Sequence, residues 1–334
     1  MKLGFDATSL TREGKGLARF QAEFLRVCER PLTVFVPEDV DESLCPPRFE
    51  YVRVRARPML RWEQVGRPRL ARRLGLDAVI HLSERASLFG PPQVVYVYEH
   101  PRHRTRRNRE VGAPRRQQLV DVVTVALFAA GVRRAAVVLC ASESTRRDVG
   151  RGEVVYPGVS ELFSPDERER TYFLHLASHD PRDNSEVVLE AYRRLAEPRP
   201  PLVVGGNAPA ALRERARDLD VEWAGFRTGE ALADLYRGAI AYVDPSLYEG
   251  FGLQAAEALA CGTPVVCSDV TSLPEVVGKA GILLDPHDVE GFAVAMRSLA
   301  ADPDLCRELA ARARRFSWAE TARATIAAAE RAAA

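Results

Sequence analysis

The sequence lacks the cysteine patterns of a zinc site or of a disulfide framework. Its six cysteines, Cys28, Cys45, Cys140, Cys261, Cys267 and Cys306, are scattered and include no C-x-x-C pair. Such scatter favours small buried thiols in a reducing cytoplasm over metal ligands or cross-links. We therefore expect a cytoplasmic protein without a metal site.

Long apolar runs are also absent. No run approaches the roughly 20 residues that span a bilayer, and the first ten residues show no signal-peptide pattern. Neither internal repeats nor low-complexity tracts are present. A chain of 334 residues is too long for one ordinary core and fits two domains of roughly 150 residues each.

Charge is distributed unevenly, although the net formal charge is only +1. Residues 1–160 carry +10 and residues 161–334 carry −9. Seven arginines fall between positions 102 and 116, with Glu110 as the one acidic residue among them. We expect the basic half to face an anionic partner, such as a phosphorylated acceptor, a polyanion or a membrane surface. Nucleic acid is not expected, because no fold signature for it is present and the other half is acidic.

Short β-rich runs alternate with amphipathic helical stretches. The expected strands are residues 2–6, 32–36, 50–55, 77–81, 93–98, 136–141, 172–176, 201–205, 221–223, 239–243, 264–267 and 281–284, and the expected helices are about 15–29, 115–130, 185–197, 209–219, 229–237, 288–301 and 303–315. Two such series predict an α/β protein with two doubly wound parallel sheets, divided at 156–170. Ligands of these sheets bind outside the carboxyl ends of the strands.

The most informative segment is EGFGLQAAEALACGTPVVCSD at 249–269. Its two glutamates, Glu249 and Glu257, are eight positions apart around two glycines and an alanine-rich run. The alanine-rich run predicts a helix, with Glu249 in the loop before it and Glu257 about two turns along. Gly250 and Gly252 allow a sharp turn and a close approach of a ligand to the main chain. Because N–H groups at such a helix start bind anions, the segment suits a sugar attached to a phosphate.

This segment resembles the signature of the retaining family 4 glycosyltransferases with the GT-B fold, the E-x7-E group. Further segments resemble the family, in the family's order, along nearly the whole chain. They are GFDATSLTREGKGLARF, WEQVGRPRLARRLGLDAVIH, ASESTRRDV, VVYPGVS, WAGFRTGEALADLYRGAIAYVDPSLYEGFGL, SLPEVVGKAGILLDPHD and FSWAET. The resemblance implies two Rossmann-like domains facing each other across a cleft. It implies an acceptor-binding domain at 1–160, a nucleotide-sugar-binding domain at 161–316 and a C-terminal helix at 317–334 that crosses back to the first domain.

The resemblance also implies the reaction and several residue roles. The reaction is transfer of a sugar from a UDP- or GDP-linked donor with retained configuration, without a metal or another cofactor. Glu257 matches the glutamate that holds the ribose hydroxyls, and Glu249 matches the one that contacts the transferred sugar. The main chain around Phe251, Gly252 and Leu253 matches the groups that hold the sugar and its phosphate.

Three further site residues are implied by position. Gly16 matches the glycine that lets the first domain approach the diphosphate, and Phe226 lies near the usual place of the base. The family commonly has His-Asp after the strand at 93–98, where this chain has Tyr-Glu-His. Glu99 aligns with the carboxylate, and His100 is expected to take the place of the family's histidine. The alternative is that His100 and His103 lie in a solvated arginine-rich loop.

The loop ASHDPRDN at 177–184 departs from the family pattern. Arg182 and Asn184 are present, but Asp183 stands where the family has a lysine that grips the donor phosphate. A carboxylate beside a diphosphate is unfavourable. Three explanations stay open: Arg182 takes over the phosphate contact, a cation of the first domain does so, or turnover is weak or lost.

The expected function is therefore that of a retaining glycosyltransferase in bacterial polysaccharide, glycolipid or natural-product glycosylation. Its partners would be a nucleotide-sugar donor and an anionic, carbohydrate or lipid-linked acceptor, with peripheral contact at the inner face of the membrane through the basic first domain. The alternative, supported by Asp183, is a GT-B-fold binding or scaffold protein that has lost the chemistry. A GT-B epimerase or phosphorylase is less favoured, because no cofactor lysine motif is present.

Overall fold

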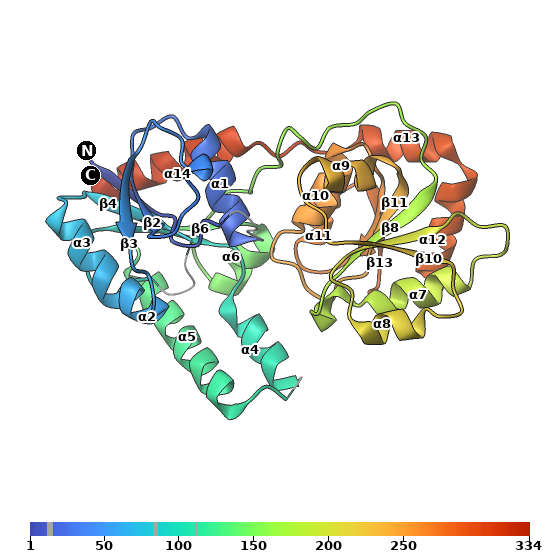
Figure 1. Cartoon of the computed structure of the whole chain (residues 1–334), viewed down its shortest axis with the longest axis horizontal. Helices are drawn as coiled ribbons and strands as arrows, with labels where there is room; N and C mark the ends of the chain where they lie inside the picture. The colour runs from blue at the N-terminus through green and yellow to red at the C-terminus, as the bar shows by residue number, and fades with distance from the viewer. Residues whose placement is uncertain (12–15, 83–85, 111) are drawn as a thin grey trace. The chain divides into compact units, whose positions relative to one another are not determined.

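The computed structural model describes residues 1–11, 16–82, 86–110 and 112–334, which divide into two compact units. Unit 1 comprises Met1–Gly158 and Ser317–Ala334, and unit 2 comprises Val159–Phe316 (Figure 1). Among the described residues, no helix has both the length and the apolar character needed to cross a membrane. The expected roles of the two domains, acceptor binding and donor binding, stay predictions.

Unit 1 is built on a parallel sheet. Its strands are β1 (Leu3–Asp6), β2 (Thr33–Pro37), β3 (Glu50–Val54), β4 (Ala78–His81), β5 (Gln93–Val97), β6 (Val137–Cys140) and β7 (Glu153–Val154), in the order β3-β2-β1-β4-β5-β6-β7. The strand order reverses between β1 and β4, where Asp6 and His81 are register partners at the carboxyl ends. Doubly wound sheets bind ligands at such a switch point.

The helices of unit 1 surround this sheet. They are α1 (Leu17–Val27), the 3-10 turn η1 (Glu42–Leu44), α2 (Met59–Arg61), the π-helical turn η2 (Trp62–Gly66), α3 (Arg67–Arg73), α4 (Pro101–Glu110), α5 (Arg115–Arg134), α6 (Glu143–Val149) and α14 (Trp318–Ala333). The last helix packs on unit 1 through Trp318, which meets Phe20 edge-on with ring centroids 4.8 Å apart. Gly158 permits this contact, because a Cβ there would lie 2.1 Å from the Trp318 nitrogen.

Unit 2 is a second parallel sheet with helices. Its strands are β8 (Tyr172–Ala177), β9 (Leu202–Gly206), β10 (Val221–Gly225), β11 (Ala239–Asp244), β12 (Val265–Ser268) and β13 (Gly281–Leu284), in the order β10-β9-β8-β11-β12-β13. The helical segments are the 3-10 turn η3 (Pro181–Asp183), α7 (Ser185–Arg193), α8 (Ala210–Arg215), α9 (Glu230–Arg237), α10 (Leu253–Ala260), α11 (Leu273–Val277), α12 (Val289–Ala301) and α13 (Pro303–Ala311). Phe173 and Leu174, neighbours in β8, enter separate apolar clusters, so both faces of this sheet are buried.

The predicted fold class, an α/β protein with two doubly wound parallel sheets, is confirmed. The predicted strands agree with the observed ones to within about two residues at either end, because continuous apolar runs mark strands that are buried on both faces. The two-residue strand β7 was not predicted, since it is too short for a periodic pattern. The arginine-rich stretch considered above as a solvated loop is helical and forms α4, which begins at Pro101, a favoured first residue of a helix.

Candidate functional site

In unit 2 the strand order reverses between β8 and β11, and the loops that follow these two strands are joined directly. The Leu247 N–H donates to the Arg182 carbonyl at 2.8 Å. The Asn184 side-chain amide donates to the Pro245 carbonyl at 3.0 Å, and the Arg182 guanidinium lies over the Tyr248 ring, 5.6 Å from its centroid. The two loops at the carboxyl edge of unit 2 therefore hold each other in place.

Glu249 lies in the loop after β11 and is held by a third loop, which follows β12. Its N–H donates to Thr271 Oγ1 at 3.0 Å, and Ser272 Oγ donates to its carbonyl at 2.9 Å. Thr271 has φ +52°, a left-handed conformation that is uncommon for a β-branched residue and is found preferentially at functional sites. The main chain of Glu249 is thus placed by two side-chain contacts, while its expected contact with the transferred sugar stays a prediction.

The start of α10 has the glycine geometry that the sequence indicates. Gly252 is the N-cap residue with φ +88°, a conformation that strains any larger residue, and a Cβ at this position would lie 2.8 Å from Leu273 Cδ2, so the Leu273 side chain would have to move. Gly250 is buried, and the Phe251 ring is buried edge-on against Phe316, with centroids 5.1 Å apart. Leu253 is the first helical residue. The first N–H groups of α10 have no partners within the helix and suit an anion.

Glu257 is almost completely buried, at 1% exposure, in α10. The Tyr236 hydroxyl donates to its Oε2 at 3.4 Å. The expectation that Glu257 lies about two turns into the helix is wrong, because Gly252 caps the helix and Glu257 is only one turn from the first residue. The carboxylate is therefore closer to the start of α10 than the alanine-rich run suggested. Its expected contact with ribose stays a prediction.

The charged residues of the loop after β8 interact with one another and with the main chain of the loop. Arg182 forms an ion pair with Asp180, with Nη2 and Oδ2 3.0 Å apart. Asp183 turns back into the loop, where its Oδ2 accepts the Ser178 N–H at 2.6 Å, and burial raises the pKa of this carboxyl. Sequence reasoning missed Asp180, although an aspartate two residues before the arginine is a common turn cap. The loop therefore presents a cation whose charge is largely neutralised.

A second carboxylate, Asp244, lies buried at the end of β11 and was not predicted. Ser246 Oγ donates to its Oδ1 at 2.5 Å, and among the described residues its Oδ2 has no hydrogen-bond partner. Burial raises the pKa of Asp244. The adjacent His175 is fixed through Nδ1 to the Val243 carbonyl at 2.8 Å. An acidic residue that ends a strand at the switch point is the signal that could have identified this position.

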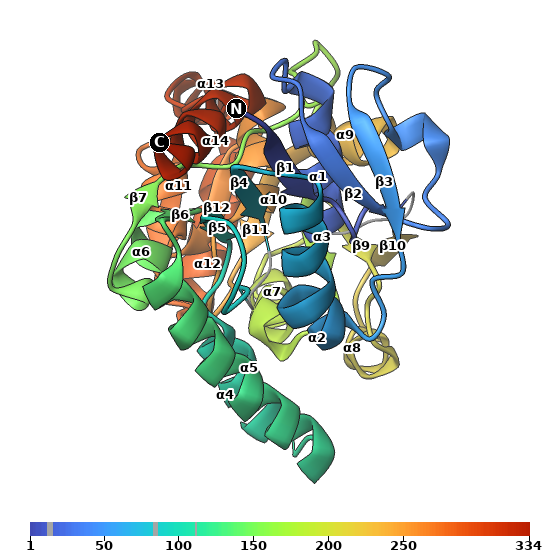
Figure 2. The same ribbon diagram turned by 90° about the vertical axis from the view of Figure 1, so that its left-hand side faces the viewer.

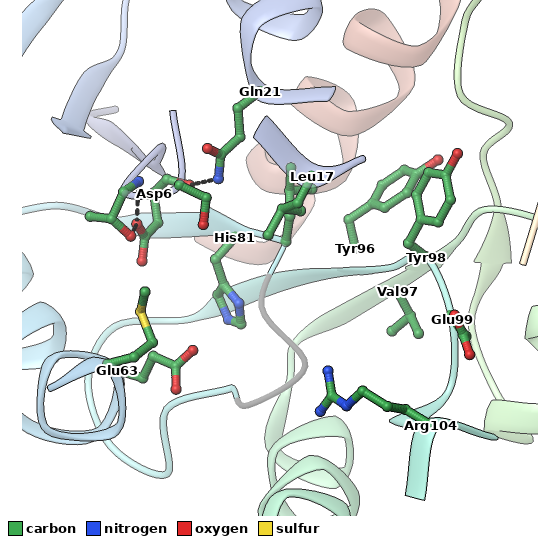
Figure 3. Close-up of a pocket in the computed structure, with 14 residues that line it drawn as sticks. Asp6, Leu17, Gln21, Glu63, His81, Tyr96, Val97, Tyr98, Glu99 and Arg104 are labelled. Atoms are coloured by element: carbon green, nitrogen blue, oxygen red, sulfur yellow. Dashed lines mark hydrogen bonds between the residues drawn. The ribbon is translucent and has the colours of Figure 1, made fainter. Parts of the chain in front are cut away.

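Unit 1 contains a cavity of about 400 Å³ at its own switch point. Its lining residues are Asp6, Thr8, Ser9, Leu17, Gln21, Met59, Glu63, His81, Leu82, Tyr96, Val97, Tyr98, Glu99 and Arg104. Figure 3 shows Asp6, Glu63 and His81 on one side of it and Tyr98, Glu99 and Arg104 on the other. The residues that carry the glycine-rich signature lie in unit 2. The protein therefore has two candidate sites, one at the carboxyl edge of each sheet.

The wall of the cavity is organised by Asp6. One carboxylate oxygen accepts Arg67 Nη1 at 2.8 Å and Trp62 Nε1 at 3.1 Å, and the other accepts the Thr8 hydroxyl at 2.6 Å. Arg67 also donates to Ser87 Oγ at 3.0 Å. Both members of the ion pair are buried, and such pairs persist only when their hydrogen bonds are satisfied in this way.

Two buried hydrogen-bond acceptors remain at this cavity. The Gln93 amide donates to the Ser87 carbonyl at 2.7 Å, so its oxygen accepts His81 Nε2 at 3.1 Å. Burial and the Arg67 charge lower the pKa of His81 well below its usual value, so the ring is neutral and its Nδ1 is an acceptor. This Nδ1 and Gln21 Oε1 have no partner among the described residues. Buried acceptors without donors favour a ligand that carries hydroxyl groups.

The other predicted site residues lie outside this lining. Gly16 is the N-cap residue of α1 with φ +51°, and a Cβ there would meet no atom within 4 Å. Phe226 follows β10 and is 40% exposed. His100 precedes α4, where its Nδ1 accepts the Arg102 N–H at 3.0 Å and its ring packs on Phe128 at 4.6 Å. Neighbouring Glu99, rather than His100, reaches the cavity. The roles predicted for Gly16, Phe226 and His100 stay predictions.

The side chains of the described residues offer no cluster of metal ligands. They contain no group of three or more His, Cys, Asp or Glu residues that could hold a metal ion. The expectation that no metal takes part stays a prediction.

Comparison with known proteins agrees with these features. The family model described as glycosyl transferases group 1 matches residues 170–302, which lie in unit 2. The chain is similar to O-antigen chain mannosyltransferase B of Escherichia coli, with 40% identity over 170 residues that cover 46% of this chain and 44% of that protein. The chain thus spans less than half the length of this curated relative.

Solved structures establish the fold more widely. Sucrose-phosphate synthase from Thermosynechococcus elongatus has a TM-score of 0.71 at 19% identity and covers 99% of this chain and 96% of its own. Anabaena HepE in complex with UDP and glucose has a TM-score of 0.70 at 17% identity, with 98% of each chain covered. The two parallel sheets and these neighbours give the chain the GT-B fold, and together with the family match they fit a family 4-type glycosyltransferase.

The environment of His100 generates a prediction about pH. Burial and the neighbouring Arg102 lower the pKa of His100 to about 4, whereas an unfolded histidine titrates near 6.5. Between these values the unfolded chain binds more protons, so the contribution of His100 to stability is complete above about pH 6.5 and is lost as the pH falls. In His100→Asn the side chain still caps α4. The free energy of unfolding should fall between pH 7 and pH 5 in the native chain, and we expect this fall to be about 1 kcal/mol smaller in the variant. This value allows for the solvent screening of a half-buried group.

Urea unfolding at both pH values measures this difference. The substitution also removes the ring contact with Phe128, but that loss is the same at both pH values and cancels in the comparison. An equal pH dependence in the two proteins would contradict the burial of a neutral His100.

Proposed function

We propose that the chain is a retaining glycosyltransferase that transfers a sugar from a nucleoside-diphosphate donor to a hydroxyl-bearing carbohydrate acceptor in polysaccharide or glycolipid assembly. The observation that carries the proposal is the geometry of residues 249–257 at the switch point of unit 2. There a positive-φ glycine opens α10, the main chain of Glu249 is held by Thr271 and Ser272, and the Glu257 carboxylate is buried one turn away.

The donor side of the reaction follows from this geometry. As the bond between the anomeric carbon and the phosphate oxygen breaks, negative charge develops on the diphosphate leaving group. N–H groups fixed at a helix start interact favourably with that charge, and preorganised donors of this kind lower a barrier by about 3–4 kcal/mol each. A buried carboxylate such as Glu257 can accept two ribose hydroxyls, and the Tyr236 hydroxyl limits its orientations.

The acceptor side of the proposal rests on the cavity in unit 1. Its buried acceptors, Gln21 Oε1 and His81 Nδ1, match hydroxyl groups rather than an anion. Glu63 and Glu99 add carboxyl groups to the lining, and Arg104 adds a cation. The relative that acts on O-antigen chains supports a carbohydrate acceptor of this kind.

A second candidate function is nucleotide binding without transfer. It is favoured by the loop after β8, in which Asp183 replaces the expected lysine and Asp180 neutralises Arg182. Under this alternative the chain binds a nucleoside diphosphate but neither hydrolyses nor transfers a donor sugar. Measurement of donor hydrolysis by the purified chain separates the two candidates.

The first of three predictions that test the proposed function concerns Glu257. In Glu257→Gln the charge that would accept the ribose hydroxyls is lost, and hydrogen bonds to charged groups contribute about 1.5–3 kcal/mol. We expect UDP or GDP to bind about 10- to 100-fold more weakly, as measured by titration calorimetry. Glu308→Gln on α13, where the glutamate is exposed, is the matched control. Unchanged affinity in Glu257→Gln would refute the ribose role.

The second prediction concerns the ion pair of Arg182. Asp180→Asn retains the cap that accepts the Arg182 N–H but removes the charge that neutralises the guanidinium. We expect this variant to bind the nucleoside diphosphate several-fold more tightly, and Arg182→Gln to bind it about tenfold more weakly. If neither variant changes the affinity, Arg182 is not the phosphate contact.

The third prediction separates the two sites. Gln21→Met keeps the length of the side chain but removes the buried acceptor at the unit 1 cavity, together with the hydrogen bond that the Gln21 amide donates to the Asp6 carbonyl at 3.1 Å. We expect transfer to glycoside acceptors to fall because KM for the acceptor rises at least tenfold, while nucleoside-diphosphate affinity is unchanged. Transfer assays across an acceptor series measure this effect, with Glu257→Gln as the reciprocal variant that changes the donor KM. A change in donor affinity in Gln21→Met would contradict separate sites.

A further inference from the structure

Helices α4 and α5 form a hairpin that projects from the rest of unit 1 (Figure 2). Its base is fixed to the unit, since Phe128 and Val132 of α5 belong to a core cluster with Val95 and Val138 of the sheet. Farther along the hairpin the two helices contact mainly each other. The residues on the remaining faces are therefore available to a partner.

The contact between the two helices is polar. Asp121 of α5 is buried at 1% exposure and accepts the Asn108 side-chain amide of α4 at 2.8 Å. Gln117 donates to its other oxygen at 2.9 Å. Thr105 and Thr124 are buried beside this contact. The hairpin is thus held by hydrogen bonds between buried polar groups rather than by apolar packing.

The opposite face of α5 is aliphatic and open to solvent. Leu119, Val120, Val122 and Val123 are 41–66% exposed. The pairs 119/122, 119/123 and 120/123 are three or four residues apart, so the four side chains share one broad face of α5. A globular helix normally turns its apolar face inwards, as α5 does at its base through Phe128 and Val132, whereas the outer part of α5 does the reverse. Contiguous exposed aliphatic residues of this kind mark an interaction surface.

Arginines stand at both ends of this aliphatic face. Arg115 and Arg116 lie one turn before it, Arg133 and Arg134 lie at the end of α5, and all four are exposed. Across residues 101–134 there are nine arginines and only two acidic residues, Glu110 and Asp121, of which Asp121 is buried in the hairpin. Positive charge therefore lies one turn before the aliphatic face, with more at the far end of α5.

We propose that the outer face of α5 docks on the surface of an anionic lipid bilayer. Aliphatic side chains between arginines match the boundary between acyl chains and anionic headgroups, where amphipathic helices lie in the plane of the membrane. A second copy of the chain is a poorer fit. Parallel pairing of two α5 faces would bring Arg115 and Arg116 against the same arginines of the second copy, so like charges would repel. In either orientation α5 offers these arginines no exposed acidic partner, because its one acidic residue, Asp121, is buried.

This inference does not rest on glycosyl transfer. It concerns the outer face of α5, none of whose residues line the cavity, whereas Arg104 of the hairpin's other helix, α4, does. Membrane docking would bring a lipid-linked acceptor to the same unit that carries the cavity. Glu257→Gln should bind vesicles like the native chain, so failure of the proposed function and failure of the docking surface are distinguishable.

Sedimentation of the full chain with lipid vesicles tests the proposal. Vesicles of phosphatidylcholine containing phosphatidylglycerol should bind the chain, and vesicles of phosphatidylcholine alone should bind it at least tenfold more weakly. Binding should weaken between 50 and 500 mM salt as the charges are screened. Equal binding to both kinds of vesicle, or no binding to anionic vesicles at low salt, would overturn the proposal.

Two pairs of variants locate the surface. Arg115→Gln with Arg116→Gln should weaken binding to anionic vesicles about 30-fold. Arg217→Gln with Arg323→Gln makes the same charge change at two exposed arginines elsewhere in the chain and should have no comparable effect. Leu119→Gln with Val123→Gln should weaken binding at least tenfold, and Val294→Gln, at another exposed valine, is its control. Both pairs change exposed side chains, and the helicity of each variant is checked by circular dichroism.

Light scattering of the chain without lipid addresses the second copy. The proposal expects a mass that is the same in the native chain and in the Leu119→Gln, Val123→Gln double variant. A dimer that dissociates in this double variant, together with vesicle binding that the variant leaves unchanged, would assign the face to a second copy and overturn membrane docking.

Discussion

Unit 1 depends on one buried carboxylate. Asp6 ends the first strand, and its burial is tolerable only because Arg67, Trp62 and Thr8 all donate to it. These bonds hold the helical segment that begins at Met59 over the switch point of the sheet. Through Ser87, Arg67 also fixes the chain between β4 and β5. The wall of the cavity follows from this single charge and its partner, and burial together with the Arg67 charge lowers the pKa of His81.

In unit 2, hydrogen bonds between loops, rather than one buried ion pair, hold the switch point in place. Its switch point carries three loops that are hydrogen bonded to one another, and the strain of Thr271 and the left-handed Gly252 are part of their construction. Because the loop after β12 holds the main chain of Glu249 in place and the start of α10 lies beside it, the proposed diphosphate site would require little rearrangement. Preorganisation of this kind is the main way in which a protein without a catalytic nucleophile stabilises a leaving group.

The arginine-rich hairpin shows why a hydrophobic pattern alone is ambiguous. The aliphatic spacing of α5 predicts a helix with an apolar face, and α5 was predicted as a helix at 115–130. The pattern does not say which face turns inwards. Asn108 reverses the usual choice, because its amide satisfies the buried Asp121 and leaves Leu119 and Val123 facing solvent. That partnership joins two helices and cannot be read from the periodicity of either.

The sequence by itself determined the two doubly wound sheets, since apolar runs buried on both faces are unmistakable, and it located the glycine-rich segment at the end of β11. Only the tertiary structure decided which partners the charged and titratable side chains have and which of them are neutral. Asp180 neutralises Arg182, His100 caps α4 instead of lining the cavity, and His81 loses its charge next to Arg67. The physical reason is that strand formation depends on residues close in the chain, whereas the state of a charged group depends on the burial and partners that folding brings to it.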